Sequence, residues 1–132
     1  MAAYEPPPFV ARTASRNGIA RVAVQGELDH ATVPLLKAQL ARLGDGDGNG
    51  RHAPPVLLDL RGLTFMDSSG LQAVLEMMAG ASSRGRRAAA IGVNGRVRKI
   101  FELTRTSDVL NEADALELIQ RFMRSDAEEA AE

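Results

Sequence analysis

The 132-residue chain contains no cysteine and no tryptophan, and its aromatic residues are four phenylalanines and one tyrosine. Without cysteine the protein can form no disulfide, offer no thiolate nucleophile and hold no cysteine-ligated zinc. So few aromatic side chains also argue against a platform that stacks nucleic-acid bases or sugar rings. These absences remove thiol, zinc-cysteine and base-stacking chemistry from the candidate functions.

Charge of one sign and long apolar runs are lacking as well. The chain has 16 basic and 17 acidic residues and a formal net charge of −1, so it carries no basic footprint for nucleic acid or anionic lipid. No apolar run approaches the roughly 18 residues of a membrane helix. Residues 1–8 lack the basic and apolar regions of a signal peptide. We expect a cytoplasmic protein that contacts neither nucleic acid nor a membrane directly.

Apolar periodicity and turn residues divide the chain into strands and helices. Asn17-Gly18 is a two-residue hairpin signal. Strands are predicted at 9–15, 19–25, 56–60, 87–93 and 109–110. Helices are predicted at about 32–43, from 71 onward, around 97–101 and at 113–124. Thr32 is the expected cap of the first helix, and Leu116, Ile119 and Met123 are the expected apolar residues of the last.

This order of elements predicts one α/β domain, in which a mixed β-sheet with an N-terminal hairpin has helices packed against it. Its expected extent is 9–124. Residues 1–8, with three consecutive prolines, are expected to form a flexible leader, and the acidic residues 125–132 a disordered tail. Residues 44–55 are expected to be a flexible, glycine-rich connection.

The most informative stretch is the turn Asp67-Ser68-Ser69-Gly70, between an apolar strand and a helix with one apolar face. That face comprises Leu71, Val74, Leu75 and Met78. Side-chain oxygens in the turn can cap the free N–H groups of the helix's first turn. The turn also sets two hydroxyls at the positive end of the helix dipole, where a phosphate is tolerated.

A second loop, Gly26-Glu27-Leu28-Asp29-His30, follows the preceding strand. Sites of α/β sheets lie at the carboxyl ends of the strands. We therefore expect Asp29 and His30 to lie beside Asp67 and Ser68. This expectation requires that the two strands be adjacent in the sheet.

These two motifs, Gly26–His30 and Phe65–Leu71, and the order of elements around them resemble the bacterial anti-sigma factor antagonists. Those are single-domain members of the STAS family, and the resemblance covers roughly Phe9 to Met123. It implies a STAS-like fold without enzymatic activity. It also implies a serine phosphorylated by a partner that is both anti-sigma factor and kinase, which corresponds here to Ser68. The unphosphorylated antagonist binds that partner and frees a sigma factor, and a PP2C-type phosphatase resets the switch.

The resemblance places a partner-binding surface at Asp29, His30, Asp67, Ser68, Ser69 and Gly70. Several of these residues also have a purely structural interpretation. Asp67 either sets a carboxylate beside the acceptor hydroxyl or only caps the helix. Gly70 either admits a neighbouring backbone or only avoids a clash with the sheet. Asp29 either contributes to docking or only forms an Asx turn. His30 is expected at the surface, and Ser69 is expected to cap or pack.

Other functions are less well supported by the sequence. The run 45–50 resembles the first half of an EF-hand, but Val56 stands where the loop needs its glutamate, and Pro54 and Pro55 block the exiting helix. A hydrolase built from Ser68, His30 and Asp29 lacks the G-x-S-x-G elbow. We expect no metal and no cofactor. A STAS subunit of a stressosome-like or transporter-associated assembly stays open, as does a small-ligand or nucleotide-binding domain, although no phosphate-binding P-loop is present.

Overall fold

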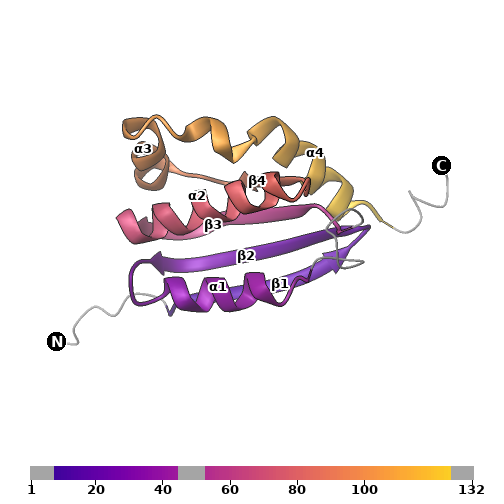
Figure 1. Ribbon diagram of the computed structural model, residues 1–132, viewed down its shortest axis with the longest axis horizontal. Coiled ribbons are helices and arrows are strands. Elements are labelled where there is room, and N and C mark those ends of the chain that lie inside the picture. The colour runs from indigo at the N-terminus through magenta and orange to yellow at the C-terminus, as the bar shows by residue number, and fades with distance from the viewer. Residues whose placement is uncertain (1–7, 45–52, 126–132) are drawn as a thin grey trace.

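The computed structural model of the protein describes residues 8–44 and 53–125 (Figure 1). Its strands are β1 (Val10–Arg16), β2 (Ile19–Leu28), β3 (Val56–Met66) and β4 (Ala88–Ile91). Its helices are α1 (Val33–Ala41), α2 (Ser68–Ser83), α3 (Gly95–Leu103), the 3-10 turn η1 (Ser107–Leu110) and α4 (Glu112–Met123). The expectations for the leader, the acidic tail and the run 45–50 concern residues outside these ranges, apart from residues 8 and 125, and stay predictions. No described helix is long and apolar enough to cross a membrane.

The four strands form one mixed sheet in the order β1-β2-β3-β4. The hairpin between β1 and β2 turns at Asn17 and Gly18, whose φ angles of 53° and 75° are both left-handed, as a tight two-residue turn requires. β2, β3 and β4 then run parallel. The α/β fold with an N-terminal hairpin is therefore confirmed.

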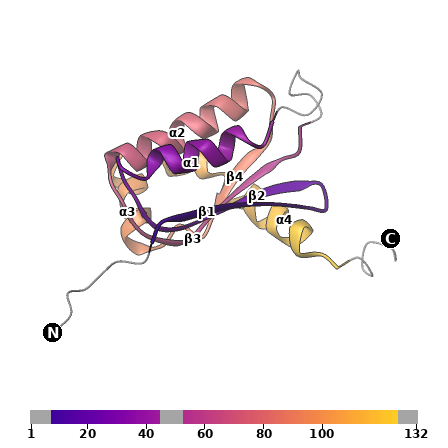
Figure 2. The ribbon, with the colours of Figure 1, turned by 90° about the horizontal axis from the view of Figure 1, so that it is seen from below.

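Helices cover both faces of the sheet (Figure 2). α1 and α2 lie on one face, over the larger core, in which residues such as Val22, Leu58 and Val74 are fully buried. α4 lies on the other face, over a smaller core that includes Ile19, Leu57 and Leu118. Because alternate side chains of a strand point to opposite faces, adjacent Leu57 and Leu58 feed different cores.

Two central strands are longer than the sequence predicts. β2 continues to Leu28, so the residues expected to begin a loop at Gly26 are still paired. β3 continues to Met66, past the predicted end at Leu60. Pairing explains both extensions, because Gly26, Glu27 and Leu28 lie opposite the second half of β3, beyond irregularities in register. The predicted ends of β2 and β3 were too early because the polar and glycine residues that suggested loops are paired within the sheet.

Two other expectations near the C-terminus are wrong. Residues 109–110 form no strand but end η1, because left-handed Asn111 turns the chain directly into α4. The apolar side of α4 was also misassigned, since Leu116 and Met123 are 60% and 62% exposed. The buried residues of α4 are instead Ala115, Leu118 and Phe122, which share the neighbouring face of the helix.

Thr32 stands at the N-cap position of α1, but its side chain makes no capping hydrogen bond. The predicted position of the cap is therefore correct, but the predicted side-chain hydrogen bond is absent. α1 begins later and ends earlier than predicted, at Val33 and Ala41.

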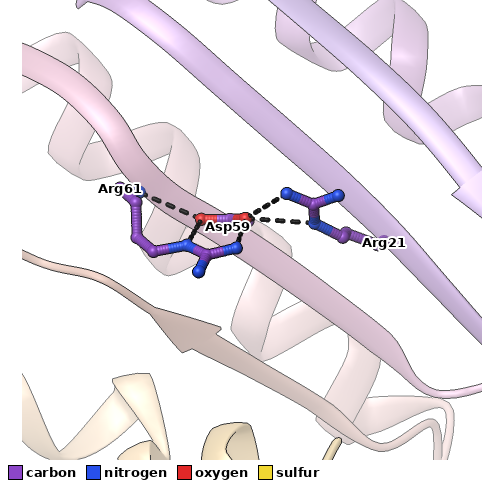
Figure 3. Close-up of polar contacts among 3 residues, drawn as sticks. All are labelled: Arg21, Asp59 and Arg61. Carbon is purple, nitrogen blue, oxygen red and sulfur yellow. Dashed lines mark hydrogen bonds and ion pairs between the residues drawn. The ribbon is translucent and has the colours of Figure 1, made fainter. Parts of the chain in front are cut away.

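One carboxylate is buried on the α4 face of the sheet, within a run that the sequence marks as apolar. Asp59 is 3% exposed and lies between two arginines (Figure 3). Its Oδ2 accepts hydrogen bonds from Nε and Nη2 of Arg21, at 3.0 and 2.6 Å. Arg61 donates from its backbone N and its Nε to Oδ1, at 3.1 and 2.9 Å, and from Nη2 to Oδ2, at 2.7 Å. The Arg21 guanidinium also lies 5.6 Å from the centre of the Phe122 ring, which ties the cluster to α4.

The arginines determine the charge state of Asp59. Burial opposes ionisation of the carboxyl, but the hydrogen bonds from Arg61 and Arg21 outweigh it and lower the pKa to about 2. Because the pKa is lower in the folded than in the unfolded protein, ionised Asp59 stabilises the fold above about pH 4. That contribution is lost as the pH falls towards 2.

Replacing Asp59 by Asn is expected to lower the free energy of unfolding at neutral pH by about 2 kcal/mol or more, since the charge that both arginines bind is removed. The variant should also lose less stability than the wild type as the pH is lowered from 4 to 2. Urea unfolding at several pH values measures both effects. Glu102→Gln, at an exposed position of α3, is the control and is expected to change neither. Equal pH dependence of Asp59→Asn and wild type would contradict this account.

Candidate functional site

Parallel pairing of β2 with β3 brings the two sequence motifs together. Leu28 and Met66, the last residues of these strands, are register partners. The backbone N–H of Asp67 donates to the carbonyl oxygen of Leu28 at 3.2 Å, which extends the contact past the end of β3. The loop after β2 and the turn before α2 are therefore neighbours, as expected from the topology.

Asp67 is the N-cap of α2. Its backbone is extended, with φ −100° and ψ −173°, and its Oδ1 accepts a hydrogen bond from the N–H of Gly70 at 3.0 Å. The capping interpretation is thus confirmed, and the half-buried carboxylate also stands next to Ser68 in the chain. Ser68 is the first residue of the helix and is exposed, and its hydroxyl bonds to none of the described residues.

Gly70 is buried where the first turn of α2 meets the end of β2. A Cβ at this position would lie 2.5 Å from the carbonyl oxygen of Leu28 and 2.7 Å from the side chain of Met66. Contacts this short do not occur for a real side chain. Of the two interpretations of Gly70, the structure supports avoidance of a clash with the sheet, because the atoms that a Cβ would meet belong to Leu28 at the end of β2 and Met66 at the end of β3.

Asp29 organises the loop between β2 and α1. Its Oδ1 accepts hydrogen bonds from the N–H groups of Ala31 and Thr32, both at 3.0 Å, and its own N–H donates to the Thr32 hydroxyl at 2.9 Å. This is the Asx turn given as the structural alternative for Asp29. His30, next in the chain, is exposed, as expected.

A groove runs between α1 and α2 beside the turn. It has a volume of about 470 Å³ and is lined by residues that include His30, Val33, Pro34, Ser69 and Gln72. Ser69 is half-buried there and adjoins the groove, whereas Ser68 is not among the lining residues. Lys37 and Glu76, also in its wall, form an exposed ion pair at 3.8 Å across the two helices.

Two exposed apolar side chains, one of them near the turn, were not identified from the sequence. Phe65, two residues before Asp67, is 42% exposed, and Leu35 in α1 is 54% exposed. Leu71 and Val74, in contrast, are buried as expected. A sequence signal for Phe65 existed, because it alternates with buried Met66 at the end of a strand.

Metal chemistry finds little support in this arrangement. Within 8–44 and 53–125, no group of three or more histidine or acidic residues is placed to hold a metal ion. The run 45–50 lies outside these ranges, and Val56, where an EF-hand needs glutamate, is the buried first residue of β3. The carboxylate of Asp29 is engaged by backbone N–H groups of its own loop and does not orient His30 as a catalytic base.

Sequence comparison assigns the fold and its two motifs to a known family. The family model described as "Mlab, STAS domain" matches residues 11–112. The chain belongs to the STAS family. Among the curated proteins, this STAS domain is 30% identical over 103 residues to the anti-sigma F factor antagonist of Paenibacillus polymyxa, covering 75% of this chain and 85% of that protein.

Solved structures agree with this assignment. An anti-sigma factor antagonist from Mycobacterium paratuberculosis superposes with a TM-score of 0.67 at 20% identity, covering 86% of this chain and 95% of that one. The unphosphorylated form of the anti-sigma factor antagonist SpoIIAA gives a TM-score of 0.54 at 25% identity, covering 72% and 82%. SpoIIAA has also been solved in its phosphorylated form. The STAS domain thus shares its fold with proteins named as anti-sigma factor antagonists.

Replacing Gly70 by Ala is expected to destabilise the domain by about 1–3 kcal/mol, because the new methyl group forces the end of β2 away from α2. Gly80→Ala is the matched control in the same helix. A Cβ at Gly80 meets no atom within 4 Å, so this change should stabilise the domain by up to about 1 kcal/mol. Urea unfolding gives both values, and a neutral Gly70→Ala would refute the close approach.

Replacing Asp67 by Ala is expected to lower the free energy of unfolding by about 1 kcal/mol, because the N–H of Gly70 loses its acceptor. Asp67→Asn keeps a capping oxygen and should retain most of the stability. Thermal unfolding compares the three proteins. An Asn variant as unstable as the Ala variant would show that charge, rather than capping, makes Asp67 stabilising.

Proposed function

We propose that this STAS domain is an anti-sigma factor antagonist that binds an anti-sigma factor kinase while Ser68 is unphosphorylated and loses that affinity when Ser68 carries a phosphate. The observation that carries the proposal is the exposed hydroxyl of Ser68 at the first position of α2, beside the loop of Asp29 and His30. The names of its relatives support it. The protein then acts in the cytoplasm without enzymatic activity, and a PP2C-type phosphatase restores the unphosphorylated form.

Ser68 fits the role of a substrate better than that of a nucleophile. A nucleophilic serine needs a base within hydrogen-bond reach and a third group that orients the base. A serine modified by a kinase needs only exposure and a rigid position, because the partner supplies ATP, metal and base. The Asp67 cap and the buried Gly70 contact hold the turn in place while Ser68 stays accessible.

Phosphorylation at this position is compatible with the folded state. A phosphate brings about −1.5 to −2 charges to the N-terminus of α2. The helix dipole favours negative charge there by about 0.3–1 kcal/mol. The added charge is therefore not expected to destabilise the fold. It changes the electrostatic potential of the surface that the partner contacts.

Repulsion at that surface is large enough to act as a switch. Two like unit charges about 4 Å apart repel by ~4 kcal/mol at an effective dielectric constant of 20. Each ~1.4 kcal/mol lowers affinity tenfold, so one such contact reduces binding by more than a hundredfold. The exposed side chain of Phe65 and the loop of Asp29 and His30 lie on the surface proposed to contact the partner.

The proposal is tested by incubating the protein with ATP and candidate anti-sigma factor kinases, mapping the modified residue by mass spectrometry and measuring affinity by calorimetry. Ser68→Ala should abolish labelling and keep partner binding, because the neutral surface is preserved. True phosphorylation should lower affinity about a hundredfold or more.

Ser69→Ala is the matched control, since Ser69 is adjacent but lines the groove between α1 and α2. It should be labelled like the wild type. Undiminished labelling of Ser68→Ala would overturn the assignment of the site. Unchanged affinity of the phosphorylated protein would overturn the switching mechanism, whichever serine is modified.

A further inference from the structure

The two edges of the sheet differ in how their backbone groups are satisfied. β4 is a four-residue edge strand, and Asn111 donates from its side-chain Nδ2 to the carbonyl oxygen of Ala88 at 2.9 Å. β1 is the opposite edge, seven residues long, and among the described strands it pairs only with β2. One edge is thus short and partly capped, and the other is long.

The hairpin determines which backbone groups of β1 face outward. Arg16 and Ile19 close the two-residue turn, which makes them a hydrogen-bonded pair. Alternation along the ladder then directs the N–H and C=O groups of Ala11, Thr13 and Ser15 away from β2. No backbone or side-chain group within the described part of the chain bonds to them. β1 therefore offers three residues that can pair with a further strand.

Cationic side chains stand beside this open edge. Arg12 and Arg16 are both exposed and point to the α4 face of the sheet, with the small residue Ala14 between them. Arg21 on the next strand lies opposite Ala14. The buried carboxylate of that face, Asp59, already pairs with Arg21 and Arg61. Glu27 of β2 has no partner on β1, because β1 begins at Val10, opposite Gln25. The edge is thus positively charged although the whole chain carries a net charge of −1.

These charges determine the kind of strand that can pair with β1. A second copy of the chain, paired antiparallel about Ala14, would set Arg12 of each copy directly opposite Arg16 of the other, and like charges directly opposite are destabilising. Paired about Thr13, the arginines of the two copies would still be diagonal neighbours. A strand with carboxylates at alternate positions would instead place them opposite Arg12 and Arg16. Residues of β1 that pair with β2 through hydrogen bonds form non-hydrogen-bonded pairs with the added strand, where side chains approach most closely.

We propose that β1 is a docking edge for an extended acidic peptide of a partner protein. The main chain of Ala11, Thr13 and Ser15 supplies the hydrogen bonds, and Arg12 and Arg16 select acidic side chains. The proposal concerns the sheet edge and is independent of phosphorylation at Ser68.

The first test measures binding of a fluorescein-labelled peptide of alternating valine and glutamate by anisotropy at low salt. We expect saturable binding that weakens as salt is added, and at least about tenfold weaker binding of a peptide with lysine in place of glutamate. Arg12→Glu should weaken binding of the glutamate peptide at least about tenfold. Amide NMR shifts on titration should concentrate in β1.

The second test separates the strand edge from mere charge. Thr13→Pro removes an N–H that faces outward, so it should abolish peptide binding while the ladder between β1 and β2 stays intact. Thr13→Val is the matched control, because it keeps the N–H and, like the Pro variant, loses the 3.0 Å hydrogen bond from the Thr13 hydroxyl to Gln39. Thr13→Val should bind within about twofold of the wild type. Circular dichroism confirms that both variants are folded.

Four outcomes would overturn the proposal. Absence of binding would mean that the arginines only keep the edge from pairing. Equal affinity of Thr13→Pro and Thr13→Val would mean that the peptide binds a charged face and not the edge. Binding seen only after removal of the acidic residues 126–132 would make this chain's own segment the occupant. A dimer in sedimentation that Thr13→Pro abolishes would make the occupant a second copy.

Discussion

The close approach between the end of β2 and the first turn of α2 is the constraint on which the site depends. The carbonyl of Leu28 accepts from the N–H of Asp67 and lies so near Gly70 that no side chain fits there. Because both contacts involve backbone atoms, neither can relax by a change of rotamer. The turn that carries Ser68 is therefore fixed to the central pair of strands.

In the switch proposed above, this rigidity lets a phosphate on Ser68 act on a partner without changing the fold. Asp67 satisfies one helix N–H, and the helix dipole accepts further negative charge, so the turn tolerates a phosphate. The phosphate then weakens binding of any negatively charged surface that docks against Ser68, and does not destabilise the fold. In the proposed switch, the domain presents charge at a fixed place, and the partner experiences the repulsion.

The opposite face of the sheet is organised by a different interaction. Asp59 is buried and ionised because Arg21 and Arg61 both bind it, and Arg21 in turn packs near Phe122 of α4. Gly92, at the end of β4, leaves space for the Arg61 side chain, since a Cβ there would overlap it. This cluster contacts α4 through Phe122, and Arg12 and Arg16 stand on the same face of the sheet beside the open edge of β1.

Local signals along the chain predicted much of this structure. Asn17-Gly18 predicted the hairpin, the apolar positions of α2 predicted its buried face, and the two motifs predicted neighbouring loops. Predictions failed where residues depended on distant partners. Leu116 and Leu118 both suit an amphipathic helix. Leu118 is buried because it packs in the core with Ile19 and Leu57, and Leu116 is left exposed.

The sequence by itself determined the order of elements, the α/β class and the residues of the turn, because turn chemistry and apolar periodicity act over a few residues. Only the tertiary structure decided that Gly70 is required by Leu28, that Asp59 stays ionised between two arginines, and that β1 remains open at the edge. Each of these depends on atoms that are distant in the chain and adjacent only after the strands have paired.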